Sequence, residues 1–373
     1  MPRFLKARHI FDGGKMLEGH TVGIEGREIT AVLPAAELPS SAEVIDLGDG
    51  FLAPGFIDVQ VNGGGGVNLN DTPTARGVLT IASAHRRFGT TGLLPTVITD
   101  APEVLLAATD AVRGARAADP AVLGIHIEGP FLDPVRKGAH EAQFIRPMSP
   151  EDVTWLSDLH CGSVLLTLAP NKVSAADVAT LATEGLHICL GHAEASHAEA
   201  MAALQAGAKG FTHLFNAMSQ MTGREPGMVG TALGSDAFAG LIADGFHVHE
   251  AMLKLAIKAK PGKIMLVTDA MCTAAGGPDH FYLQGREVRV KDGRLELPDG
   301  TLAGSNLTMD EAVRFCVGRL GLPLEQVLPL ASANPAAFLG LGHRLGHIRP
   351  GHLASLVYLN QDLHVQQTWV EGA

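Results

Sequence analysis

The stretch Val122-Leu-Gly-Ile-His-Ile-Glu128 decides the predicted fold, because it is a short apolar run that ends in a carboxylate. Short runs rich in Ile, Leu and Val are typical of parallel strands that are buried on both faces. Three further runs of this kind also end in a titratable residue, which is His192, His213 or Asp269. Polar groups at the carboxyl ends of parallel strands gather at the face where a barrel builds its active site. The four runs therefore predict one shared site.

Apolar runs of strand length recur from residue 56 onward, with helical stretches such as 174–184 and 194–206 between them. The eight candidate strands are 56–61, 92–96, 122–128, 164–169, 187–192, 210–213, 241–244 and 264–269. This alternation favours a (β/α)8 TIM-like barrel of the α/β class over an open doubly wound sheet. No Gly-x-Gly-x-x-Gly motif follows a strand with an acidic residue about 20 positions later, which argues against a dinucleotide-binding fold. Two Asp-Gly turn signals predict an extra hairpin within 286–303.

The two ends of the chain show short strands and turns in place of this alternation. Residues 22–32 have the pattern of a hairpin that turns at Gly26-Arg27, and 354–359 and 365–370 are strand-like. We predict that both termini build one small β-sandwich domain beside the barrel. The predicted parts are 1–53 and 341–373 for the small domain and 54–340 for the barrel.

The composition excludes several classes of protein. The chain has 373 residues and is 46% hydrophobic, enough for the core of one large and one small domain. Its net charge of −11 argues against non-specific binding to nucleic acid or to an anionic membrane. The start lacks the apolar region of a signal peptide, and no apolar run approaches about 18 residues. The four scattered cysteines favour buried free thiols over disulfides. We expect a cytoplasmic protein without nucleic-acid or membrane partners.

Glu128, His192 and His213 form the ligand set that we predict for a metal ion. A single such residue at a strand end is usually structural, but several on strands of one barrel favour metal binding. Two imidazoles, one carboxylate and an open position are typical of catalytic zinc, which lowers the pKa of a bound water toward 7. We predict one divalent ion, with Zn²⁺ favoured and Fe²⁺, Co²⁺ or Mn²⁺ compatible with the same ligands.

Asp269 is the predicted proton carrier of this site. It would accept a proton from the attacking water and then deliver the proton to a departing amine, because an amine leaves poorly unless it is protonated. The alternative interpretation is a helix cap or a partner in an ion pair.

A set of motifs spread over nearly the whole chain points to a known family. The motifs include Pro54-Gly-Phe-Ile-Asp-Val-Gln-Val-Asn62, His126-Ile-Glu-Gly-Pro-Phe131, Lys137-Gly-Ala-His140, Thr212-His-Leu-Phe-Asn-Ala-Met218, Thr222-Gly-Arg-Glu-Pro-Gly227, Ile242-Ala-Asp-Gly-Phe-His247 and Leu302-Ala-Gly-Ser305. Together they resemble the N-acetylglucosamine-6-phosphate deacetylases of the amidohydrolase superfamily. The resemblance implies a barrel with a small β-sandwich domain and a divalent metal. It also implies hydrolysis of the acetamide of N-acetyl-D-glucosamine 6-phosphate to D-glucosamine 6-phosphate and acetate.

The resemblance further implies which residues bind the substrate. His140 would polarise the acetamide carbonyl beside the metal. Arg224 would bind the sugar phosphate and reach in from the neighbouring subunit of a homodimer, since a guanidinium can donate two parallel hydrogen bonds to a phosphate. Without the resemblance, Arg224 would be interpreted as a solvated surface residue. The other implied contacts are Ala139, Asn216, Ala217, His247, Leu302, Ala303 and Gly304.

One position departs from the wider superfamily. Many amidohydrolases carry His-x-His at the end of the first strand, where it binds a second metal, and here that position reads Gln60-Val-Asn62. An amide is a poor ligand for a divalent metal, so we predict a single tightly held ion, with Gln60 at most a weak ligand or a contact to water. Three alternatives stay open: a deacetylase for the galactosamine-6-phosphate epimer, one for another N-acyl substrate, and, most remotely, a non-enzymatic scaffold.

Overall fold

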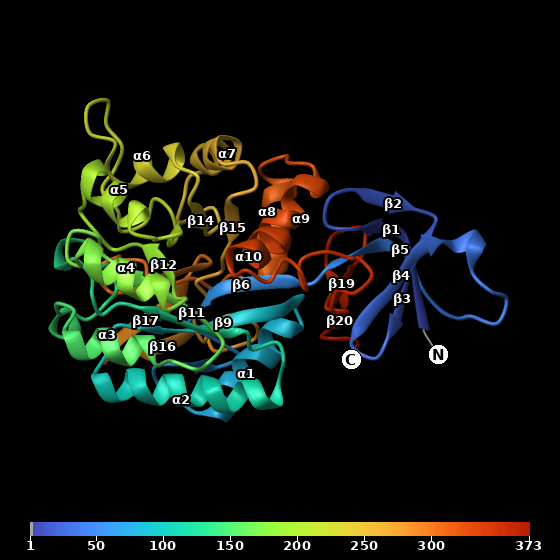
Figure 1. Ribbon diagram of the computed structural model, residues 1–373, viewed down its shortest axis with the longest axis horizontal. Coiled ribbons are helices and arrows are strands. Elements are labelled where there is room, and N and C mark those ends of the chain that lie inside the picture. Colours follow the sequence, from blue (N-terminus) through green and yellow to red (C-terminus); the bar gives the residue numbers. More distant parts are fainter. Residues whose placement is uncertain (1–2) are drawn as a thin grey trace.

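Eight parallel strands pair in chain order around a barrel in the computed structural model, which describes residues 3–373 (Figure 1). They are β6 (Phe56–Val61), β9 (Thr90–Ile98), β10 (Gly124–Glu128), β11 (Ser163–Leu168), β12 (His187–Leu190), β13 (Gly210–Phe211), β14 (Phe238–Leu241) and β15 (Ile264–Leu266). The backbone N–H of Asp269 donates to the carbonyl of Gln60 over 2.9 Å, and Val61 pairs with Ala270. The chain beyond β15 therefore meets β6, and the predicted (β/α)8 barrel is confirmed.

Helices cover the outside of the barrel, and the strands are almost wholly buried between them and the interior. The helices are α1 (Ala75–Arg86), α2 (Pro102–Ala118), α3 (Pro150–Ser157), α4 (Ala175–Thr183), α5 (His197–Gln205), α6 (Gly227–Gly234), α7 (Glu250–Ala259), α8 (Met309–Gly318), α9 (Leu324–Ala331) and α10 (Ala333–Phe338). The helix predicted from residue 194 begins only at His197. Its N-terminus is fixed there because Ser196 and Glu199 form a reciprocal capping box.

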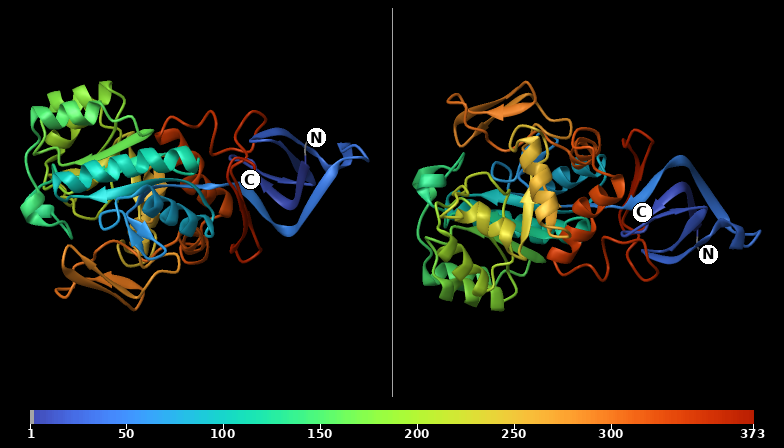
Figure 2. Two further views of the ribbon diagram at one scale, coloured as in Figure 1. Left: turned by 90° about the horizontal axis from the view of Figure 1, so that it is seen from below. Right: turned by 90° about the horizontal axis from the view of Figure 1, so that it is seen from above.

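The small domain is a seven-stranded sheet to which both ends of the chain contribute (Figure 2). Its strands are β1 (Arg3–Phe11), β2 (Met16–Glu18), β3 (His20–Glu25), β4 (Glu28–Pro34), β5 (Glu43–Pro54), β19 (Leu356–Leu359) and β20 (Val365–Trp369). The long strand β5 pairs with β1 on one side and with β19 on the other, which joins the two termini. The predicted hairpin at Gly26-Arg27 is formed by β3 and β4. The domain boundaries after residues 53 and 340 stay predictions.

A second, smaller sheet follows the eighth barrel strand and stands out from the barrel in Figure 2. It consists of β16 (His280–Leu283), β17 (Arg286–Lys291) and β18 (Arg294–Glu296), so the hairpin predicted within 286–303 gains a third strand. A further short hairpin, β7 (Gly63–Gly64) and β8 (Val67–Asn68), follows β6.

Two expectations from composition concern the chain as a whole. All four cysteines are free and buried, as predicted. Among the helices of residues 3–373, none has the length and apolar character needed to cross a membrane. The cytoplasmic location stays a prediction.

Candidate active site

Glu128 is the last residue of β10, but three other candidate site residues lie just beyond the barrel strands that were predicted to contain them. His192 and His213 come two residues after β12 and β13, and Asp269 comes three residues after β15. All three have positive φ angles, of 47°, 29° and 52°, a conformation that is uncommon outside glycine and that clusters at functional sites. These three strands were therefore predicted too long at this end, because the chain leaves the sheet to place these side chains. The seventh strand was predicted at 241–244. It corresponds to β14, which already ends at Leu241.

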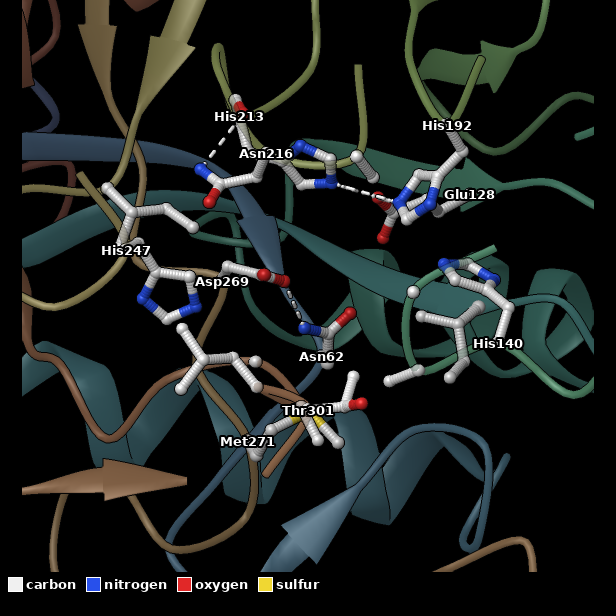
Figure 3. A pocket seen from close by; sticks show the side chains of 18 of the residues that line it. Asn62, Glu128, His140, His192, His213, Asn216, His247, Asp269, Met271 and Thr301 are labelled. Carbon is white, nitrogen blue, oxygen red and sulfur yellow. Dashed lines mark hydrogen bonds and ion pairs between the residues drawn. The ribbon is translucent and has the colours of Figure 1, made fainter. Parts of the chain in front are cut away.

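Glu128, His192 and His213 point toward one another at the carboxyl end of the barrel (Figure 3). Oε1 of Glu128 lies 3.2 Å from Nε2 of His192 and 3.0 Å from Nε2 of His213, and the two Nε2 atoms are 3.0 Å apart. In a tetrahedral zinc site with bonds of about 2.0–2.1 Å, neighbouring ligand atoms lie roughly 3.4 Å apart. The three buried side chains therefore fit a divalent ion.

His140 competes with His213 as the third ligand of this group. One atom each of Glu128, His140 and His192 also lie within 4.8 Å of one another. However, Nδ1 of His140 lies 2.8 Å from the hydroxyl of Thr99, whereas Nε2 of His213 is at 3.0 Å from both other donor atoms. The closer group contains His213, and His140 stands at its edge.

Hydrogen bonds and charge prepare the group for a cation. Nδ1 of His192 donates to the carbonyl of Arg136 over 3.0 Å, so its Nε2 carries the lone pair that faces the other donors. Although burial favours the neutral carboxyl, the two imidazoles hold the pKa of Glu128 well below its ordinary value. Burial opposes a charge on His213 as well, but the Glu128 carboxylate raises the pKa of this imidazole.

Two amide side chains donate hydrogen bonds to Asp269. Nδ2 of Asn62 donates to Oδ1 of Asp269 over 2.6 Å, and Nε2 of Gln60 donates to the same oxygen over 3.2 Å. Gln60 also places this NH₂ group 3.2 Å from both oxygens of Glu128, so it presents hydrogens to the site, and an NH₂ group is no ligand for a cation. Burial, followed by the charge of Glu128, raises the pKa of Asp269 to about 6. One oxygen of Asp269, Oδ2, is left for the pocket.

A cavity of about 290 Å³ lies above these side chains. The predicted substrate contacts that line it are Ala139, His140, Asn216, Ala217, His247, Leu302, Ala303 and Gly304. Lining residues that the prediction left out are Asn62, Ile98, Gly138, Ile242, Met271, Leu283 and Thr301. Asn62, Gly138 and Ile242 stood in quoted motifs, but the others are residues that carry no chemical signal in the sequence. Within residues 3–373, neither a lysine nor an arginine lines this cavity.

Several polar lining residues are held in place by their neighbours. Nδ1 of His247 donates to Oδ2 of Asp244 over 2.6 Å. Asn216 donates through Nδ2 to the carbonyl of His213 over 3.2 Å, which leaves its Oδ1 for a ligand. Gly304 has φ +68°, and a Cβ there would lie 2.9 Å from the carbonyl of Asp269, so the close packing of this loop on the site requires glycine.

Arg224 is the predicted substrate contact that the structure does not bring to the cavity of its own chain. It is exposed in the segment between α5 and α6, which includes a loop that projects from the body of the barrel (Figure 1). Its guanidinium makes no hydrogen bond or ion pair within the described part of the chain.

Comparisons with known proteins agree with this geometry. The model of the amidohydrolase family matches residues 51–373. The N-acetylgalactosamine-6-phosphate deacetylase of Shewanella sp. (strain ANA-3) is 42% identical over 334 residues, which cover 87% of this chain and 83% of that protein. The N-acetylglucosamine-6-phosphate deacetylase of Haemophilus influenzae is 34% identical over 365 residues, with coverage of 96% and 95%.

Among solved structures, the crystal structure of N-acetylglucosamine-6-phosphate deacetylase from Pasteurella multocida has a TM-score of 0.97 and 35% identity to this chain. The similarity covers 100% of this chain and 99% of that one. The resemblance found in the motifs is thus confirmed by sequence and by structure, and the chain belongs to the amidohydrolase family.

Proposed function

We propose that this enzyme hydrolyses the acetamide of N-acetyl-D-glucosamine 6-phosphate to D-glucosamine 6-phosphate and acetate. The observation that carries the proposal is the group of Glu128, His192 and His213 beside Asp269, at the bottom of a cavity of the size expected for a small ligand. Two of the relatives described above are named for the same activity.

Glu128, His192 and His213 would hold one divalent ion, for which Zn²⁺ is our first choice. When bound, such an ion supplies a Lewis acid for the carbonyl oxygen and lowers the pKa of a water molecule, so that hydroxide is available at neutral pH. Gln60 stabilises the arrangement through its hydrogen bonds to Glu128 and Asp269.

Asp269 would carry the proton. Its Oδ1 is occupied by the two amides, so Oδ2 takes the proton from the attacking water and gives it to the nitrogen as the C–N bond breaks. A pKa raised to about 6 suits both halves of this task, because the group is ionised at neutral pH and still basic enough to hold a proton briefly.

His140 would donate a hydrogen bond to the carbonyl oxygen. Burial, together with the neighbouring His192, holds the pKa of His140 well below its ordinary value, so the ring is neutral and carries one N–H. For Nε2 to be that N–H, Nδ1 must accept from the hydroxyl of Thr99, which lies 2.8 Å away. The Thr99 hydroxyl also lies 3.2 Å from the carbonyl oxygen of Glu128, so its one proton has to go to Nδ1 of His140 for the tautomer that stabilises the developing oxyanion.

The phosphate would be bound by Arg224 of a neighbouring subunit. No cation of the described chain lines its own cavity, and a phosphate dianion in such a site requires one. Arg224 is exposed in the segment between α5 and α6, part of which projects from the barrel (Figure 1), and it has the planar donor geometry for a phosphate. A homodimer in which each subunit completes the other's site follows from this proposal, with Asn216, His247 and the 302–304 segment holding the sugar.

A second candidate substrate is N-acetyl-D-galactosamine 6-phosphate. The observation in its favour is the 42% identity to a galactosamine-6-phosphate deacetylase, which exceeds the 34% identity to the glucosamine enzyme of H. influenzae.

Acetate release from the two epimeric 6-phosphates and from unphosphorylated N-acetylglucosamine tests the proposal and its alternative. We expect the gluco 6-phosphate to have the highest kcat/KM, and the unphosphorylated sugar to be a much poorer substrate. A higher kcat/KM for the galacto epimer would select the second candidate. No acetate from either phosphosugar, with the metal supplied, would contradict both.

A further inference from the structure

Asn62 occupies a position in the site to which no role has been given beyond its contact with Asp269. It follows β6 directly, is 4% exposed, and lines the cavity. Figure 3 shows its amide nitrogen directed at Asp269 and its oxygen on the side away from that carboxylate. The short contact of 2.6 Å between Nδ2 and Oδ1 of Asp269 joins the two residues.

The orientation of this amide follows from the chemistry of its partner. An ionised carboxylate only accepts hydrogen bonds, so the NH₂ group of Asn62 must face Asp269 and its Oδ1 must face the opposite way. That Oδ1 is buried and has no hydrogen-bond partner among residues 3–373. A buried polar atom without a partner is uncommon in a native protein and calls for an explanation. Here the atom belongs to a cavity-lining residue, so a ligand can supply the missing hydrogen.

The proposed substrate offers one hydrogen at the bottom of the cavity, and this step rests on the proposed function. The scissile acetamide has a carbonyl oxygen, which faces the metal-binding group and His140, and a single N–H. Its nitrogen must lie against Asp269 to receive the proton. Asn62 is hydrogen-bonded to Asp269, and its Oδ1 is an acceptor without a partner in the described chain. We propose that Oδ1 of Asn62 accepts the hydrogen bond of the scissile N–H.

This contact would orient the nitrogen for its protonation. The carbonyl carbon becomes tetrahedral when water adds, and the nitrogen lone pair then needs to point at Oδ2 of Asp269. When the C–N bond breaks, its electron pair stays on the nitrogen, which takes the proton from Asp269. A single amide that holds both the N–H and the carboxylate fixes the angle between the proton donor and the lone pair. Asn62 is thus both a substrate contact and a positioning residue.

The test compares an amide and an ester that differ at the proposed contact. The ester is 2-O-acetyl-D-glucose 6-phosphate, which has an oxygen in place of the scissile N–H. We expect Asn62→Ala to lower kcat/KM for the amide about 10-fold more than for the ester, because only the amide loses a hydrogen bond to Oδ1. A change in metal content affects both substrates. Loss of the hydrogen bond to Asp269 affects the amide more strongly, because an amine needs protonation to leave more than an alcohol does, so the ratio of the two kcat/KM values is compared with that of a variant that loses another hydrogen bond to Asp269.

Gln60→Ala is the matched control. Gln60 also donates to Oδ1 of Asp269 but does not line the cavity, so its loss should lower both activities and change the ratio far less than the loss of Asn62 does. Asn62→Leu, which has a similar shape and lacks both polar atoms, replaces the alanine variant if that variant folds poorly.

An equal loss on amide and ester in the Asn62 variants would overturn the proposed contact while the parent enzyme still confirms the deacetylase activity. A parent enzyme that releases acetate from neither compound would instead contradict the proposed function, and the contact with it.

Discussion

The floor and the mouth of the cavity are built on different principles. The floor consists of polar side chains from the barrel strands and the residues just after them, such as Glu128, His213 and Asp269, joined by hydrogen bonds of 2.6–3.2 Å. The mouth consists of residues at strand ends and in loops, such as Ile98, Leu283 and Leu302, and no lysine or arginine of residues 3–373 is among them. The floor is complete within one chain, whereas the mouth lacks the charge that a phosphosugar needs.

This difference suggests that the floor serves the chemical step and that the mouth serves substrate recognition. Changes in the floor should act on metal binding and on kcat, because we propose that its groups hold the metal and touch the reacting atoms. Changes that affect the mouth should act on KM and on the preference for phosphorylated substrates. Substitutions in the two regions therefore test whether the floor and the mouth have these separate roles.

The largest effect is expected for Glu128→Gln. The variant keeps the shape of the side chain but replaces a charged ligand by an amide, which binds divalent metals poorly. We expect the purified variant to retain little metal and to lose at least about 10⁴-fold in kcat. Metal content by mass spectrometry and acetate release measure the two effects. Full metal occupancy together with parental activity would remove Glu128 from the ligand set.

Asp269→Asn should be the next most severe change. It removes the proton carrier but keeps a side chain that can accept from Asn62, so we expect kcat to fall by about 10³-fold while the metal content stays at the parental level. The combination of an intact metal site and a low kcat separates this residue from Glu128. A variant that loses its metal as well would assign Asp269 to the ligands.

Arg224→Ala tests the mouth. We expect KM for the phosphorylated substrate to rise by roughly 10- to 100-fold, as for the loss of a charge-assisted hydrogen bond, with little change for the unphosphorylated sugar. Arg113→Ala, in an exposed ion pair on α2, is the control and should behave as the parent. An equal loss on both substrates would mean that Arg224 is not the phosphate ligand.

The smallest effect concerns the support beneath the floor. Asp58 is buried at the closure of the barrel and accepts hydrogen bonds from the hydroxyl and the N–H of Thr268, next to Asp269. Burial raises its pKa to about 7 from an ordinary value of 3.8. Between these two values the folded state binds a proton that the unfolded state releases, so the stability contributed by this group falls as the pH rises.

Asp58→Asn removes this titration. The difference in Tm between variant and parent should therefore shift in favour of the variant, by about 5 °C, as the pH rises from about 5 to about 8. Thermal unfolding followed at several pH values measures it. A difference that does not change with pH would show that Asp58 does not titrate in this way.

The floor could be predicted from the residues themselves, because strand ends of a parallel barrel converge and Glu128, His192, His213 and Asp269 stood at those ends. The prediction erred on the last residues of the strands, since apolar pattern does not reveal the positive φ angles at His192, His213 and Asp269. The mouth followed only from the resemblance, because residues such as Ala139 and Leu302 have no chemistry of their own. Loops place them, and loop conformation depends on contacts far apart in the sequence.

The central claim is that one ion, held by Glu128, His192 and His213, serves the reaction, while the amides of Gln60 and Asn62 leave no second strong site. Titration of metal-free enzyme with Zn²⁺, followed by acetate release, tests it most directly. The predicted result is activity that rises linearly and saturates at one equivalent per chain. Full activity before any metal is added, or saturation only at two equivalents, would contradict the claim.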